Sequence, residues 1–253
     1  MPVPPATDDQ AWPYPRWVAH RGAGKLAPEN TLAAFRVGAA HGYRMFECDV
    51  KLSADGVPFL LHDATLERTT NGHGVAAAQS WSELSRLDAG GWHSRSFAGE
   101  PLPSLDAVAR YCIQNGFLLN VEIKPTPGAE VETGSVVAQH AARLWRGHAV
   151  PPLLSSFQPE ALAAAQSAEP HLPRALLMDT MQKGWLETAL MLECVAVVFN
   201  QALWDASTLT QAHSAGLRAL SYTVNDEWAA QRLFDLGTDG VITDRVDSFS
   251  PLH

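Results

Sequence analysis

Short runs of apolar, β-prone residues recur along the chain, and segments with helical periodicity separate most of them. Strands of about four to eight residues that alternate with helices are typical of a parallel sheet. The pattern predicts nine strands, at residues 17–20, 44–50, 57–63, 118–124, 153–157, 174–178, 195–200, 218–224 and 239–244.

Two of the intervening segments carry clear helix-end signals. We expect Asn30 to N-cap a helix that Gly42 closes, and Ser104 to N-cap a helix that ends at Gly116. The second helix has an apolar face at helical spacing, made by Leu105, Val108, Ala109 and Cys112.

The gap between the second and third runs is too short for a helix. Parallel neighbours need a crossover of about a dozen residues or more, whereas an Asp-Gly pair such as Asp55-Gly56 joins antiparallel strands. We therefore predict a β-hairpin in which His62 lies opposite Asp49. The eight remaining runs fit an α/β fold, a (β/α)8 TIM barrel that forms a single domain over residues 1–253.

Residues 64–102 interrupt the alternation of strands and helices and are rich in Gly, Ser, Trp and Asn. They read as a small insertion after the second strand, lying over the barrel mouth. We expect it to be a packed cap rather than a loose loop, built on Trp81, Leu84, Leu87, Trp92 and Phe97.

Composition limits the class of protein. The 253 residues are 46% hydrophobic, which excludes a disordered chain. Lys and Arg number 18 against 27 Asp and Glu, a formal net charge of −9. An acidic surface disfavours a nucleic-acid partner, because such proteins need basic residues to displace counterions from phosphates.

Cellular location is also constrained. Residues 1–16 contain five prolines and no apolar run of signal-peptide length, and no segment reaches the roughly 18 apolar residues of a membrane span. We expect a cytoplasmic protein without a membrane anchor. The cysteines at 48, 112 and 194 fit neither a disulfide framework nor a zinc site, so we expect buried free thiols.

Charged side chains gather where the predicted strands end, which in a barrel of this type is the reactive face. Glu47 and Asp49 point to the same side of one strand, as do Glu122 and Lys124 of the next barrel strand. Three carboxylates at neighbouring strand ends predict a hard divalent cation, Mg²⁺ or Ca²⁺. The alternative is ordinary ion pairing of these acids with Arg21, Lys124 or Arg44.

His20 and His62 are the histidines that fall at predicted strand ends beside these acids. An unperturbed histidine suits proton transfer near neutral pH, so we expect an acid–base pair; additional zinc ligands are the alternative. Arg21 and Lys124 supply positive charge for a phosphate. Neither a Gly-x-Ser-x-Gly elbow nor a nucleotide-binding glycine pattern occurs, so the set favours phosphoryl chemistry without a nucleotide.

Six segments of the sequence stand out together: AHRGAGKLAPENTLAAF at 19–35, ECD at 47–49, LSADGVPFLLHDATLERTTNG at 52–72, VEIK at 121–124, SYTVN at 221–225 and DGVITD at 239–244. In this order they resemble one known family, the glycerophosphodiester phosphodiesterases, and in particular its short cytoplasmic bacterial members. The likeness runs from the first predicted strand to the last. Tyr222 departs from it, because many members have Trp there.

The resemblance implies hydrolysis of glycerophosphodiesters, such as glycerophosphocholine or glycerophosphoethanolamine, to sn-glycerol 3-phosphate and an alcohol. It implies a metal held by Glu47, Asp49 and Glu122, with His20 and His62 as catalytic residues. Arg21 and Lys124 would bind the phosphate.

We interpret His62 as the base and His20 as the acid, with water or the glycerol 2-hydroxyl as nucleophile. Three alternatives remain open: a lysophospholipase D, a non-catalytic phosphodiester-binding module and a metal-dependent nuclease. A homodimer is a further possibility. Three tryptophans could form its interface, although we expect them to pack on the barrel: Trp185, Trp204 and Trp228.

Overall fold

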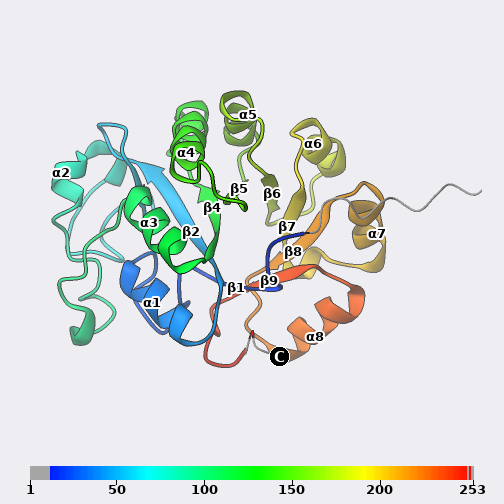
Figure 1. Cartoon of the computed structure of the whole chain (residues 1–253), viewed down its shortest axis with the longest axis horizontal. Coiled ribbons are helices and arrows are strands. Elements are labelled where there is room, and N and C mark those ends of the chain that lie inside the picture. Colours follow the sequence, from blue (N-terminus) through cyan, green and yellow to red (C-terminus); the bar gives the residue numbers. More distant parts are fainter. Residues whose placement is uncertain (1–11, 250, 252–253) are drawn as a thin grey trace, which may run out of the picture.

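Eight parallel strands form a closed barrel in the computed structural model, which describes residues 12–249 and 251 (Figure 1). The ring closes because β1 pairs with both β2 and β9. The barrel strands are β1 (Trp17–Ala19), β2 (Met45–Leu52), β4 (Leu118–Ile123), β5 (Leu153–Ser156), β6 (Arg174–Met178), β7 (Ala196–Asn200), β8 (Arg218–Tyr222) and β9 (Gly240–Thr243). The predicted TIM barrel is confirmed. Residues 1–11, which include part of the proline-rich segment 1–16, lie outside the described residues.

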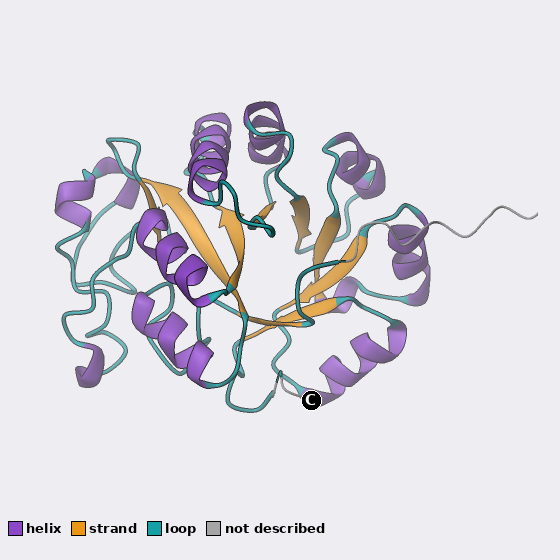
Figure 2. Ribbon diagram, viewed as in Figure 1, coloured by secondary structure: helices purple, strands orange, loops and turns teal. Residues whose placement is uncertain are grey.

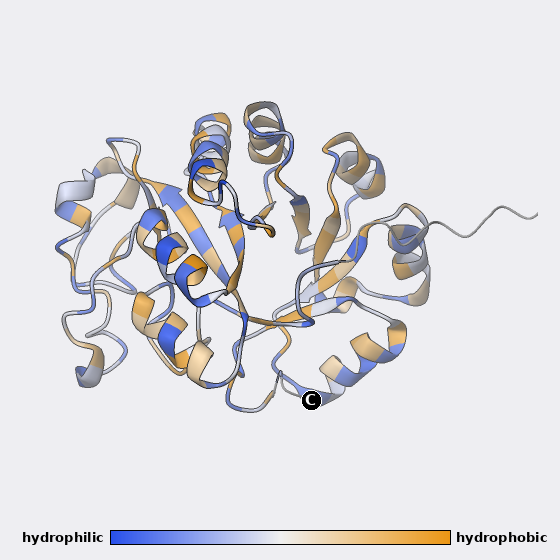
Figure 3. Cartoon of the chain, in the orientation of Figure 1, coloured by the Kyte–Doolittle hydropathy of each residue, from blue (hydrophilic) through white to orange (hydrophobic). Residues whose placement is uncertain are grey.

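Helices surround the strands on the outside of the barrel (Figure 2). Apolar side chains fill both the barrel interior and the layer between strands and helices. In Figure 3, hydrophilic bands alternate with hydrophobic ones along β2. The outer helices are α1 (Leu32–Ala40), α3 (Leu105–Asn115), α4 (Glu130–Leu144), α5 (Pro159–Ala168), α6 (Trp185–Met191), α7 (Ala206–Ser214) and α8 (Glu227–Leu236), and β7 is followed by the short η3 (Gln201–Leu203).

The two predicted helix starts have different outcomes. Ser104 caps α3 by accepting a hydrogen bond from Ala107 N, and the helix ends at a left-handed Gly116, as expected. The predicted cap of α1 is wrong by one residue. Thr31 is extended and accepts from Ala34 N, whereas Asn30 has a φ of 60° that an N-cap does not adopt.

The predicted hairpin exists, but its register is shifted by one residue. β3 (Pro58–Leu60) runs antiparallel to β2 with Val50 opposite Leu60, and Leu61 N donates to Asp49 O. Leu61, not His62, therefore lies opposite Asp49. The turn causes the shift. Ser53 N donates to Val57 O, so the loop between them has three residues, among them the left-handed Gly56 (φ 76°), where a two-residue loop was expected.

The insertion after the hairpin consists of short elements, η1 (Ala76–Ala78), α2 (Trp81–Leu84) and η2 (Arg95–Phe97), which lie beside α1 and α3 (Figure 1). Leu84 is fully buried in a separate apolar cluster, and Trp81 and Leu87 pack against it. The predicted packed cap is thus present in part. Trp92 is 41% exposed, and Phe97 packs against the main core instead.

The three tryptophans behave differently from one another. Trp185 and Trp204 are buried and flank the ring of Phe199, as expected for packing. Trp228 on α8 is 85% exposed, so the expectation that it packs on the barrel is wrong. All three cysteines are buried and free. None of the helices in the described part of the chain is both long and apolar enough to cross a membrane.

Gly134 allows α4 and α5 to touch, which yields a test of the packing. An added Cβ there would overlap the carbonyl oxygen of Ala161 in α5. Alanine normally favours a helix over glycine, but this overlap is with backbone and cannot be relieved by a side-chain rotation. We expect Gly134→Ala to lower the free energy of unfolding by about 1–3 kcal/mol in urea denaturation. The exposed Gln139→Ala of the same helix should change it little; equal stability of both variants would contradict the packing.

Candidate active site

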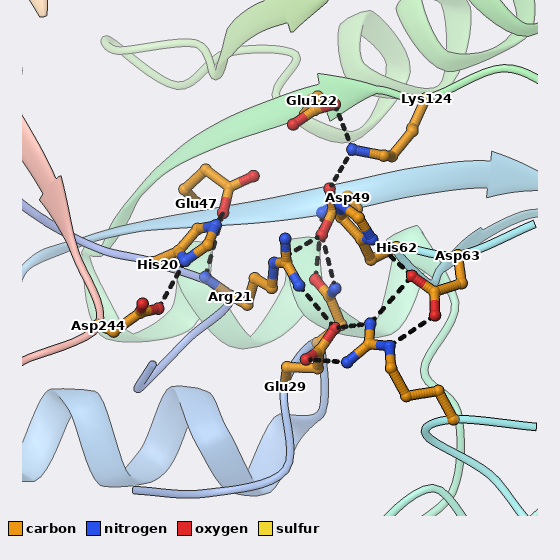
Figure 4. A network of polar contacts seen from close by, with 12 residues as sticks. His20, Arg21, Glu29, Glu47, Asp49, His62, Asp63, Glu122, Lys124 and Asp244 are labelled. Carbon is orange, nitrogen blue, oxygen red and sulfur yellow. Dashed lines mark hydrogen bonds and ion pairs between the residues drawn. The ribbon is translucent and has the colours of Figure 1, made fainter. Parts of the chain in front are cut away.

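The barrel mouth brings together all seven residues singled out from the sequence. Glu47 and Asp49 project from β2 and Glu122 from β4, while His20, His62 and Lys124 follow the ends of β1, β3 and β4 (Figure 4). Six of the seven line one cavity of about 130 Å³, hereafter the central cavity. Asp49 is the exception: it lies beneath the others and is 1% exposed.

Three carboxylates converge at this site. One oxygen from each of Glu47, Asp49 and Glu122 lies within 4.8 Å of the others, and all three residues are buried. Burial and the neighbouring acids raise the pKa of Glu47 well above its ordinary value and that of Glu122 to about 7. Burial acts on Asp49 in the same direction, but Arg21 and Lys124 outweigh it and hold the pKa of Asp49 well below its ordinary value.

Asp49 is the most fully bonded of the three. Its Oδ2 accepts from Asn30 Nδ2 at 2.8 Å, and its backbone N donates to Asn30 Oδ1 at 3.1 Å. Lys124 Nζ lies 3.3 Å from Asp49 Oδ1. The side chain of Asn30, expected to cap α1, is thus used to orient Asp49, which explains why the capping role falls to Thr31.

Arg21 is held in an uncommon backbone conformation, with a φ of 50°. Its N–H donates to Glu47 Oε2 at 3.1 Å and its Nη1 to Glu29 Oε1 at 2.8 Å. Arg21 Nε is buried and lies 3.3 Å from Asp49 Oδ2, yet it makes no aligned hydrogen bond within residues 12–249 and 251. Arg21 also lines the central cavity, so its guanidinium borders any anion bound there.

His20 is oriented by a carboxylate from the other end of the chain. Its Nδ1 lies 2.6 Å from Asp244 Oδ1, and burial of Asp244 is outweighed by His20 and Asn225, which lower the pKa of that carboxyl. An ionised carboxylate only accepts, so Nδ1 carries the hydrogen and Nε2 of the neutral ring has a lone pair. Nε2 lies 3.8 Å from Glu47 Oε2.

His62 has the same arrangement with Asp63. Its Nδ1 lies 2.7 Å from Asp63 Oδ1, and Arg68 of the insertion binds both Asp63 and Glu29. Arg68 and His62 hold the pKa of Asp63 down to about 2. The two carboxylates therefore present both histidines in the same tautomer, with Nε2 free for proton transfer.

Sequence reasoning missed the roles of Asp63, Arg68, Asp244 and Lys51. Asp244 directly follows β9, so the strand-end argument used for Glu122 could have found it. Lys51 continues the alternation of Glu47 and Asp49 along β2 and is only 3% exposed. Burial and Lys124 lower its pKa. Arg68 lies in the insertion, where no local pattern indicates its partners.

The residues present fit a divalent cation. Among the described residues of the network and Lys51, six carboxyl groups face four cationic side chains, so full ionisation leaves an excess of two negative charges. Repulsion among the acids contributes to the raised pKa values of Glu47 and Glu122. Ion pairs with Arg21 and Lys124 do occur, as in the alternative interpretation. Among the described residues, however, no Lys or Arg side chain lies within 4.0 Å of the Glu47 carboxylate, which has only the His20 ring at 3.8 Å. Arg44 instead lies over Phe117. The converging group contains no histidine, which disfavours zinc.

The known proteins that this chain matches agree with this chemistry. The sequence pattern of the glycerophosphoryl diester phosphodiesterase family matches residues 20–248. The chain belongs to this family. The glycerophosphodiester phosphodiesterase of Caldanaerobacter subterraneus subsp. tengcongensis is 32% identical over 237 residues, which cover 90% of this chain and 93% of the relative. The expectation of a glycerophosphodiester phosphodiesterase is confirmed.

Solved structures give the same result. A phosphodiesterase from Oleispira antarctica, in complex with the product sn-glycerol-3-phosphate, is 34% identical with a TM-score of 0.85 and covers 91% of this chain and 93% of its own. The glycerophosphodiester phosphodiesterase of Agrobacterium tumefaciens is 27% identical with a TM-score of 0.78 and covers 94% and 100%. Members of the glycerophosphoryl diester phosphodiesterase family thus share this barrel over nearly the whole chain.

The raised pKa of Glu122 gives a stability prediction. A carboxyl group whose pKa rises from 4.5 to about 7 on folding binds more protons in the native than in the unfolded chain over that interval. Stability without divalent ions should therefore fall as pH rises from about 5 to about 7.5. Glu122→Gln cannot ionise, so its melting temperature should fall less over this range. The exposed Glu132→Gln should behave like the wild type. If the melting temperature changes equally with pH in all three proteins, the raised pKa assigned to Glu122 is wrong.

Proposed function

We propose that the chain hydrolyses glycerophosphodiesters to sn-glycerol 3-phosphate and an alcohol, with a divalent cation and with His20 and His62 as acid and base. The observation that carries this proposal is the pair of carboxylate-oriented histidines lining one small cavity with a cluster of acids. The product complex of the Oleispira antarctica relative supports the same product here.

Glu47, Asp49 and Glu122 would hold the cation, for which Mg²⁺ and Ca²⁺ are the candidates. The bound cation supplies positive charge that polarises the phosphate and neutralises charge on its oxygens. Asn30 and Arg21 fix Asp49 and Glu47 through the contacts described above, so these ligands are oriented before the substrate arrives.

Arg21 and Lys124 would bind the non-bridging phosphate oxygens. Arg21 has an unsatisfied Nε, and Lys124 Nζ lies between Asp49 and Glu122 at 3.3 and 2.8 Å. Both side chains border the central cavity, so a phosphate there meets two fixed cations. Charge that develops on the phosphate during the reaction is stabilised by groups that need not reorganise.

The two histidines would move the protons. In each ring the aspartate holds Nδ1–H, so protons move at Nε2. The base would start neutral and accept a proton from the nucleophile, and the acid would start as the imidazolium and donate its Nε2 proton to the departing oxygen. The nucleophile is water or the glycerol 2-hydroxyl. The assignment of His62 as base and His20 as acid depends on the side of the phosphate on which the leaving alcohol lies.

The opposite wall of the central cavity is largely apolar, with Phe157, Leu177, Tyr222 and Ile242. The Tyr222 hydroxyl donates to Met178 O and Asp179 Oδ1, and the rings of Tyr222 and Phe157 are nearly perpendicular to each other. A compact wall suits a three-carbon glycerol better than an acyl chain. It therefore favours a glycerophosphodiester substrate over the lysophospholipid of a lysophospholipase D, which is the second candidate.

Three further expectations stay predictions: a single domain over residues 1–253, action in the cytoplasm and a homodimer.

Turnover of a diester tests the proposal directly. Purified protein with glycerophosphocholine and Mg²⁺ or Ca²⁺ should release glycerol 3-phosphate, followed through a coupled dehydrogenase. EDTA should stop the reaction, and Glu47→Gln should need more metal for half-maximal rate because one of three ligands loses its charge. Absence of product with every divalent ion tried would sink the enzymatic proposal.

Removal of either histidine should lower kcat by about 10²–10⁴, the usual contribution of a general acid or base. We expect this of both His20→Ala and His62→Ala, with melting temperatures close to the wild type. His140→Ala is the matched control, because His140 is also paired with an aspartate and is as exposed as His62, 30% in each case. Full activity of either site variant would remove that histidine from the mechanism.

A further inference from the structure

A second cavity adjoins the central one and contains a lysine that the proposed mechanism does not use. This side cavity holds about 520 Å³, against about 130 Å³ for the central cavity. His62, Glu122, Lys124 and Phe157 line both, so the two cavities meet at the reacting centre. Lys51 lines the side cavity but not the central one.

Lys51 is a buried cation without an anionic partner. It is 3% exposed, and its Nζ makes one hydrogen bond within residues 12–249 and 251, to Lys124 O at 3.3 Å. No carboxylate of the described chain lies within 4.0 Å of it. An ammonium has three donors and is costly to bury unpaired, so this group has the capacity to bind an anion in the cavity it lines.

The acids of the side cavity do not cancel this charge, because each is already paired. Glu122 accepts from Lys124 at 2.8 Å, and Asp63 is bound by Arg68 and His62. Gln158, the residue before α5, also lines the side cavity, and the amino end of a helix carries partial positive charge. Lys51 and the start of α5 therefore make this cavity attractive to an anion.

A phosphodiester has two substituents, and the two cavities differ in size. Glycerol, the invariant substituent, suits the compact central cavity, which leaves the larger side cavity for the alcohol that varies between substrates. We propose that the side cavity binds this head group and that Lys51 selects alcohols carrying a carboxylate. The inference rests on the proposed function. It also places His62 next to the departing oxygen, so His62 would be the acid and His20 the base, the reverse of the assignment made from the sequence.

Glycerophosphoserine and glycerophosphoethanolamine provide the test, because they differ by one carboxylate. We expect the wild type to have a kcat/KM about tenfold higher or more for the serine diester, the size of a charge-assisted contact. Lys51→Met should bring the ratio close to one while the ethanolamine diester keeps its kcat/KM within about twofold. Lys51→Arg should retain the preference, since it keeps the charge.

The wild-type ratio is informative without any variant, so the test survives if Lys51→Met fails to fold. A wild-type ratio of one or less overturns the inference. So does an equal loss for both diesters in a folded Lys51→Met protein, which would place Lys51 on the reacting phosphate. Hydrolysis of neither diester by the wild type with divalent ions would overturn the proposed function itself, and this inference with it.

Discussion

Burial of the Asp49 carboxylate is the constraint on which the barrel mouth depends. An ionised group that is 1% exposed needs compensation on every side, because burying an unpaired charge is costly. Asn30 and Arg21, both between β1 and α1, and Lys124 after β4 supply it. Arg21 also contacts Glu47 and Glu29, and Lys124 also contacts Glu122, so the requirement of one carboxylate fixes the positions of the others.

The same network joins the insertion to the chemistry. Arg68 reaches from the insertion to Glu29 and Asp63, and Asp63 orients His62. A segment that stands outside the strand–helix alternation thereby determines the tautomer of one histidine. His20 depends instead on Asp244, at the end of the last strand. The two chemically equivalent histidines are thus supported by independent parts of the fold.

Strand periodicity and the strand-end rule were enough to predict the barrel and the gathering of the seven singled-out side chains at its mouth. Alternation along β2 places Glu47 and Asp49 together, and the resemblance adds their roles. Features set by tertiary contacts could not be predicted this way. Asn30 looked like a helix cap because the demand of Asp49 is not visible in its own neighbourhood, and the hairpin register depended on one extra residue in the turn. Lys51 has an ordinary strand position, and only the structure shows that none of the described carboxylates forms an ion pair with it.

The contact between His20 and Asp244 spans almost the entire described chain, and β1 pairs with β9 beside it. During synthesis the N-terminal strand emerges first and its histidine has no carboxylate partner until the last strand has left the ribosome. Intermediates that lack β9 leave the barrel open at β1, so they expose a strand edge as well as an unsupported histidine. The same strand thus closes the barrel and brings the carboxylate that orients His20, so a chain truncated before β9 lacks both.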